Sequence, residues 1–274
     1  MFSTVVTTRK RPSALRHLLD SLKPFACHDI VVVVNDCPDT VKMLRSRPLD
    51  ENIKIIALNQ NIGAGRGKHR GIEAAQNNRV LVIDDDAIVL GGSDLDYCLN
   101  KLNDYSLVQG LILADSKKKR RSFEQPFWFR KNRSGDHDIS YFVGAIHFIN
   151  RDDFLAAGGY ADAAEYGFEE LELSLNLLSR GKRLLFTDKF RIHHKRDSGG
   201  RRDAQTVAAE MLDKRNQISA KYFPIPVALF AQLVWNIKLL PKARKIIFRF
   251  ADQGSVFGYR DLIRNPRLLS RAFA

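Results

Sequence analysis

Two uninterrupted apolar runs constrain the fold of this chain more than any other feature. They are DIVVVVND (29–36) and VLVIDDD (80–86), and neither alternates apolar with polar residues as a strand with one wet face would. Similar runs occupy 2–8 and 53–59, and a helical pattern from 64 to 77 precedes the last strand. Strands buried on both faces and joined through helices predict right-handed crossovers in a mostly parallel α/β sheet.

Polar residues gather where these runs end. In an open parallel sheet, ligands bind beyond the carboxyl ends of the strands. We therefore predict a site at this edge, built from residues at the ends of the four runs: Thr7, Thr8, Asn35, Asp36, Asn59, Asp84, Asp85 and Asp86.

The second half of the chain has a different pattern, and beyond about Asp203 only helical patterns remain. We divide the chain into a catalytic α/β domain (1–202) and a C-terminal helical segment (203–274). In the second half of the α/β domain we expect strands at 106–114, 139–150 and 183–188, a short helix from 151 and an amphipathic helix over 168–181.

The composition limits which partners and which cellular compartment we expect for the protein. The formal net charge of +13 indicates polyanionic partners: nucleic acid, anionic lipid or phosphorylated small molecules. Three cysteines without metal-ligand spacing favour reduced thiols and a cytoplasmic protein. The longest apolar tract, 223–240, is interrupted by Gln232, Asn236 and Lys238, so we do not expect it to span a bilayer.

The Asp84-Asp85-Asp86 triplet is the first candidate for chemistry. Carboxylates at the end of a buried strand are costly unless a cation neutralises them, and Mg²⁺ or Mn²⁺ prefers such oxygen ligands. The alternative is a polar loop that caps the next helix.

Two further clusters follow. Glu169, Glu170 and Glu172 begin the helix over 168–181, where the helix dipole alone would favour acidic residues, but a buried carboxylate there could also accept a proton. His193 and His194 would point to opposite faces of a strand, so at most one should reach a given site, and the other reading is a structural histidine.

Taken in order, these segments resemble a family 2 glycosyltransferase of the GT-A fold over about residues 2–200. VLVIDDDAIV is similar to the strand that carries the family's DXD metal motif, and GFEELELSLNLLSRG to the acceptor-side helix with its Glu-Asp motif. The remaining matches are TVVTTRKRPSALRHLLDSL, DIVVVVNDCPD, NQNIGAGRGKHRGIEAA and FVGAIHFINRDDFLAAGGY.

The resemblance implies an inverting transfer from a nucleotide-sugar donor, with Mn²⁺ or Mg²⁺ held by Asp84, Asp86 and His193. It implies Glu170, or else Glu169, as the general base that deprotonates an acceptor hydroxyl of a glycan or a lipid-linked sugar. The expected donor-binding residues are Thr7, Thr8, Arg9, Asn35, Asp36, Asn61, Gly63, Lys68, Asp84 and Asp85.

Three residues depart from the family pattern. Asn35 and Lys68 stand where the family more often has aspartate and arginine, and Glu170 replaces the aspartate of the Glu-Asp motif. Asp36 or Asp39 could therefore contact the base instead of Asn35. Two other functions remain open: a nucleotidyltransferase, which would not need the later Glu-Glu and His elements, and an inactive lipid-binding scaffold.

Basic segments suggest where the protein works. Residues 117–133 hold eight Lys or Arg among four aromatic residues, but no nucleic-acid-binding fold accompanies them, so we expect a membrane or acceptor-phosphate contact and no nucleic acid. Residues 226–240 are apolar around most of a helix, and 238–271 carry nine Lys or Arg against two Asp. This pattern favours a helix lying on the inner face of the cell membrane; packing on the catalytic domain or in a homodimer is the alternative.

Overall fold

The structure is a computed structural model that describes residues 1–46, 52–114, 135–160, 167–195, 203–251 and 254–273. The basic and aromatic segment 117–133 therefore lies outside the described residues. The described part contains no helix that is both long and apolar enough to cross a membrane.

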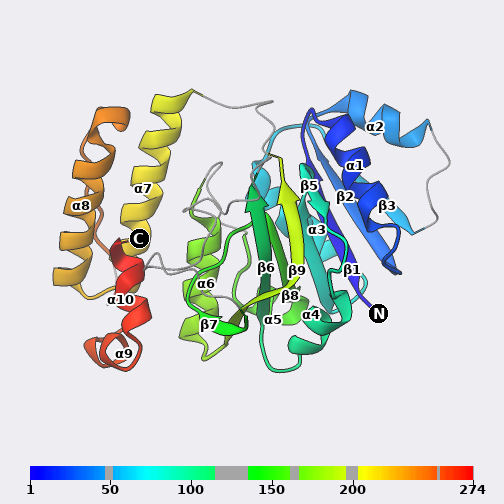
Figure 1. Cartoon of the computed structure of the whole chain (residues 1–274). Helices are drawn as coiled ribbons and strands as arrows, with labels where there is room; N and C mark the ends of the chain where they lie inside the picture. The colour runs from blue at the N-terminus through cyan, green and yellow to red at the C-terminus, as the bar shows by residue number, and fades with distance from the viewer. Residues whose placement is uncertain (47–51, 115–134, 161–166, 196–202, 252–253, 274) are drawn as a thin grey trace.

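The four apolar runs form a parallel sheet, as predicted (Figure 1). β1 (Ser3–Thr8) lies between β2 (Asp29–Asn35) and β4 (Arg79–Asp84), and β3 (Ile53–Leu58) pairs with the outer side of β2. All seven residues of β2 are buried, which is why the run carries no alternation.

Helices cover both faces of this sheet. One core cluster joins it to α1 (Pro12–Leu22), α2 (Pro38–Arg45) and α4 (Leu95–Lys101). The other joins it to α3 (Ala64–Ala74), α5 (Arg151–Ala156) and α6 (Glu169–Ser179). The α/β fold class with helices on both faces is thus confirmed.

The second half of the sheet is mixed. β8 (Ile146–Asn150) pairs antiparallel with both β4 and β6 (Leu107–Ala114), and β6 runs parallel to β9 (Leu184–His194). β5 (Ala87–Val89) and β7 (His137–Ile139) each pair antiparallel with β9. All pairs among the first four strands are thus parallel, and the second half of the sheet combines the parallel pair β6–β9 with antiparallel pairs.

The strand expected over 139–150 is in fact two strands separated by a loop. The backbone N–H of Val143 donates to the side-chain Oε1 of Gln109 at 2.8 Å, instead of joining a strand ladder. The strand expected at 183–188 is longer than predicted, because β9 continues to His194 past an irregularity opposite Gln109 and Leu111. This extension brings a histidine to the edge of the sheet where β4 ends.

The C-terminal segment folds into α7 (Ala204–Tyr222), α8 (Ile225–Ala243), α9 (Tyr259–Arg264) and α10 (Pro266–Phe273). In Figure 1 these helices stand beside α6, on the side of the molecule away from β3. Leu171 and Leu175 of α6 share a buried cluster with Tyr222 and Phe223. The segment is therefore packed against the helix that carries the predicted base.

Candidate active site

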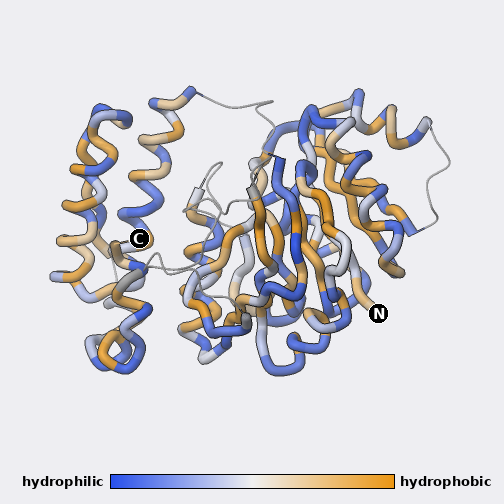
Figure 2. Tube along the Cα trace, viewed as in Figure 1, coloured by the Kyte–Doolittle hydropathy of each residue, from blue (hydrophilic) through white to orange (hydrophobic). Residues whose placement is uncertain are grey.

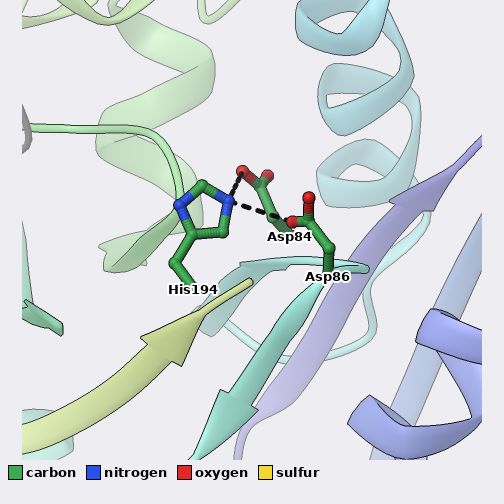
Figure 3. A group of neighbouring side chains, drawn as sticks. All are labelled: Asp84, Asp86 and His194. Carbon is green, nitrogen blue, oxygen red and sulfur yellow. Dashed lines mark hydrogen bonds and ion pairs between the residues drawn. The ribbon is translucent and has the colours of Figure 1, made fainter. Parts of the chain in front are cut away.

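Asp84, Asp86 and His194 form the central group of the site. Asp84 ends β4, Asp86 precedes β5, and the antiparallel pairing of β5 with β9 sets Ala87 opposite His194. The His194 Nε2 lies 3.0 Å from Asp86 Oδ1 and 3.9 Å from Asp84 Oδ2. Figure 3 shows the three side chains pointing toward one another, and one ligand atom from each lies within 4.8 Å of the others.

The histidine of this group is His194 and not the expected His193. Successive residues of a strand point to opposite faces, and in β9 it is the second histidine that points toward Asp84 and Asp86. Within the described ranges of the chain, no group forms a hydrogen bond with the buried Nε2 of His193. The resemblance pointed to His193, and the structure places the next residue, His194, beside the two aspartates.

The donor set of this group fits a divalent cation. Two carboxylates and one imidazole within 4.8 Å can present oxygen and nitrogen atoms to a single ion. The carboxylate of Asp86 is already shared between His194 and Arg11, whose Nη1 lies 3.1 Å from Asp86 Oδ2. Cationic or hydrogen-bonding groups thus surround each side of this buried carboxylate, as its burial requires.

Asp85 has a different environment from its two neighbours. It accepts a hydrogen bond from Thr8 Oγ1 at 2.6 Å and forms an ion pair with Arg11 at 2.9 Å. Burial raises the pKa of Asp85 to about 6, although Arg11 and Thr8 act in the opposite direction. Through these contacts Asp85 holds the end of β4 against the end of β1 and the residues that follow it.

Lys68 connects the metal group to the other half of the site. Its buried ammonium lies 2.8 Å from Asp84 Oδ1 and donates to the carbonyl of Gly144 at 2.9 Å. Burial opposes its charge, but the carboxylates of Asp84, Glu170 and Glu169 outweigh this effect and raise the pKa of Lys68. The lysine is therefore a permanent cation between two groups of carboxylates.

Glu169 and Glu170 open α6, immediately after Phe168, which has a left-handed backbone with φ of 65°. Burial raises the pKa of both carboxyl groups, and burial together with the charge of Glu169 raises that of Glu170 to about 8. A carboxyl group with such a pKa can exchange a proton near neutral pH. Glu170 therefore has the electrostatic property expected of a general base, and the pKa of Glu169 is shifted in the same direction.

Gly144 fixes the place of the Glu170 carboxylate. A Cβ at position 144 would lie 1.9 Å from Glu170 Oε1, so only glycine leaves room for the acid in this position. The loop between β7 and β8 thus supplies both the carbonyl that holds Lys68 and the space that Glu170 fills.

The residues expected to bind the donor fall into two sets. Asn35 bonds to the loop that begins α3: its Nδ2 donates to Asn61 Oδ1 at 2.9 Å, and its Oδ1 accepts from Ile62 N at 3.0 Å. Gly63, at the N-cap of α3, has φ of 86°, a conformation that favours glycine. Asn35 and Asn61 therefore set the conformation of this loop through hydrogen bonds, and Gly63 through its backbone angle.

The second set, which includes Thr7, Arg9 and Asp36, lies near the ends of β1, β2 and β4. A cavity of about 640 Å³ lies beyond the ends of β2 and β3, lined among others by Asp36, Lys42 and Asn59. Asp36 also forms an ion pair with Arg9 at 3.3 Å. At the end of β1 the buried hydroxyl of Thr7 has no hydrogen-bond partner among the described residues. This cavity lies where the resemblance places the nucleotide base, and Asp36 is the acidic residue in it.

A second cavity, of about 560 Å³, lies beside α6. Glu169, Tyr160 and Lys221 are among the residues that line it. The Glu169 Oε2 and the Tyr160 hydroxyl are buried without hydrogen-bond partners in the described structure. The glycine-rich approach to α6 continues into 161–166, which lie outside the described residues.

Sequence reasoning missed three residues of this site. Arg11 was only one of several basic residues after the first strand, and nothing local indicated that it would meet Asp85 and Asp86. Gly144 lay inside a segment interpreted as continuous strand, although an interior glycine is a recognised sign of close approach. Tyr160 follows two glycines and carried no signal of its own.

Comparison with known proteins gives the context for this geometry. The family described as glycosyl transferase family 2 matches residues 3–156. No curated protein matches the chain in sequence.

Solved structures share the fold. GalNAc-T7 with UDP, GalNAc and Mn²⁺ aligns with a TM-score of 0.56 and 16% identity over 73% of this chain and 44% of that one. S. aureus TarS 1-349 aligns with a TM-score of 0.60 and 14% identity over 87% and 71%. Its complex with UDP-GlcNAc gives a TM-score of 0.60 and 14% identity over 86% and 72%. This chain thus spans less than half the length of the GalNAc-T7 chain.

Proposed function

Because the chain belongs to glycosyl transferase family 2, we propose that it is an inverting hexosyltransferase that uses a nucleoside-diphosphate sugar. The acceptor is a hydroxyl of a glycan or of a lipid-linked sugar. The observation that carries the proposal is the position of Lys68, which lies between the Asp84, Asp86 and His194 group and the half-buried carboxylates of Glu169 and Glu170.

Asp84, Asp86 and His194 would hold the divalent cation. Two carboxylates fit a hard ion, and the imidazole favours Mn²⁺ over Mg²⁺, which prefers oxygen ligands throughout. When bound, the cation would neutralise the diphosphate that leaves the sugar. Two structural neighbours, GalNAc-T7 with Mn²⁺ and UDP and TarS with UDP-GlcNAc, support such a donor.

Glu170 is the proposed base. Its carboxylate would take the proton of the acceptor hydroxyl as that oxygen attacks the anomeric carbon, so that one bond to the carbon forms as the bond to the diphosphate breaks. The positive charge of Lys68 would offset the repulsion between the carboxylates of Asp84 and Glu170. It would thereby lower the free-energy cost of keeping both of them ionised. Glu169 lines the second cavity, through which we propose that the acceptor enters.

The test is a panel of nucleotide sugars assayed for release of nucleoside diphosphate, with Mn²⁺ and with EDTA. We expect release from one or a few donors, stopped by EDTA and restored by added Mn²⁺. Release of pyrophosphate from sugar phosphate and nucleoside triphosphate would instead indicate a nucleotidyltransferase. The absence of any turnover or donor binding would leave only a scaffold role and refute the proposal.

A further inference from the structure

Helix α8 has two apolar faces: one packs inside the protein, and the other is largely exposed in the described part of the chain. The inner face, which includes Ala228, Ala231 and Trp235, is buried against α7 and the C-terminal core. A helix that is apolar all round is normally covered on all sides. The outer face of α8 therefore requires an explanation.

The outer face is exposed in the described structure. Phe230 is 59% exposed and Ile237 67%, and Leu233 and Leu240 continue the same row at helical spacing. Figure 2 shows hydrophobic residues along much of α8, at the edge of the molecule farthest from β3. We call this row the outer face of α8: Ile225, Phe230, Leu233, Ile237 and Leu240.

Basic residues adjoin this face and acidic residues are absent from the segment. Between Ile225 and Phe250 there are five Lys or Arg and not one Asp or Glu. Lys242, Arg244 and Lys245 are exposed and form no ion pair with any residue in the described part of the chain. Arg249, by contrast, is paired with Asp213 at 2.6 Å. Three cations at the end of α8 are thus available to an anionic partner.

These features distinguish a bilayer from a second copy of the chain. In a two-fold dimer both copies would bring the five Lys or Arg residues of this segment into one interface, with no Asp or Glu of the segment to neutralise them. An anionic lipid surface accepts both components: apolar side chains enter the acyl boundary while the Lys and Arg residues contact phosphate groups.

We propose that the outer face of α8 and the cations at its end bind an anionic membrane surface, with α8 lying in the plane of the interface. The contact does not span the bilayer, which agrees with the absence of a spanning helix among the described residues. The proposal is independent of the reaction, since lipid binding needs neither donor nor cation.

The experiment is flotation of the full chain with vesicles of neutral phosphatidylcholine, or of the same lipid with phosphatidylglycerol, at low and high salt. The intact protein should float with the anionic vesicles at low salt and less well at high salt. Ile237→Ser combined with Leu233→Ser should lower the partition coefficient by about tenfold or more, since each removes one exposed apolar side chain from the acyl boundary. Lys242→Glu combined with Lys245→Glu should lower it by at least about tenfold at low salt and much less at high salt.

Matched controls carry the same chemistry elsewhere. Ile263→Ser removes an apolar side chain that is 76% exposed on α9, and Arg16→Glu combined with Lys54→Glu reverses two exposed charges on α1 and β3. Both should float like the wild type. If the wild type stays at the bottom of the gradient, or if the controls lose binding as the α8 variants do, the proposal is wrong. A stable dimer in sedimentation that Ile237→Ser dissociates would also overturn it, because the face would then be covered by a second copy.

Discussion

Replacing Gly144 by alanine is a direct test of where the base lies. The added Cβ would be 1.9 Å from Glu170 Oε1 and 2.9 Å from its carboxyl carbon, whereas real Cβ contacts essentially never fall below 3.0 Å. The oxygen must therefore move by about 1 Å. The displaced atom is the end of a flexible side chain, so the protein should fold with little loss of thermal stability. A misplacement of about 1 Å at the reacting centre costs on the order of 10² in rate, and we expect kcat to fall by that factor.

The assay is transfer to acceptor under saturating donor, together with donor affinity and a melting curve. Gly91→Ala is the matched control, because a Cβ there would meet nothing within 4 Å. We expect kcat to fall in Gly144→Ala alone, with donor affinity and melting temperature close to the wild type in both variants. If Gly144→Ala retains kcat within about threefold of the wild type, Glu170 does not act from this position.

Four further predictions concern the site and its support. Turnover should rise with pH through about 8, because the raised pKa keeps Glu170 protonated below that value, and Glu170→Gln should remove this limb and lower kcat by on the order of 10² or more. His194→Ala should weaken Mn²⁺ binding, measured by calorimetry, whereas His193→Ala should not, and equal effects would contradict the assignment. Lys68→Met should remove the cation that the carboxylates of Asp84 and Glu170 share. The Mn²⁺ affinity, measured by titration, and the pH dependence of turnover, measured by pH–rate curves, should therefore both change. A chain that ends at Lys221 should melt at a lower temperature and lose activity, because it removes the core that packs on α6; unchanged activity would show that the C-terminal helices are dispensable for catalysis.

The sequence predicted the first half of the fold because its signal there is local. Four apolar runs with helical patterns between them allow few arrangements other than a parallel sheet, and their polar ends then meet at one edge. Asp84 and Asp86 were found in this way, and the structure brings them together. Glu169 and Glu170 were found from their place at the start of a helix.

The rest depended on contacts between distant segments. The choice between His193 and His194 is set by the register of β9 against β5, which period-two alternation alone does not fix. Gly144 was hidden because an apolar segment with one glycine can be read as one strand or as two with a loop between them. The pairing of Arg11 with Asp85 and Asp86 spans more than seventy residues and has no local pattern.

The C-terminal helices illustrate the same limit. Their apolar and basic pattern suggested a membrane helix or a packed helix as alternatives, and α8 has the features of both. Trp235 packs inward, where the buried guanidinium of Arg215 lies 5.3 Å from its ring centroid, while Ile237 points outward. A hydropathy pattern cannot separate these two faces until the neighbouring helix is placed.

The stereochemistry of the product tests the central claim most directly. Proton NMR would follow transfer from an α-linked nucleotide sugar to acceptor, with the wild type and with Glu170→Gln. Inverting transfer with Glu170 as the base predicts that the first product detected with the wild type is β-linked. The variant should form this product at a rate lower by a factor on the order of 10² or more. An α-linked product, or equal rates for the two proteins, would contradict this mechanism.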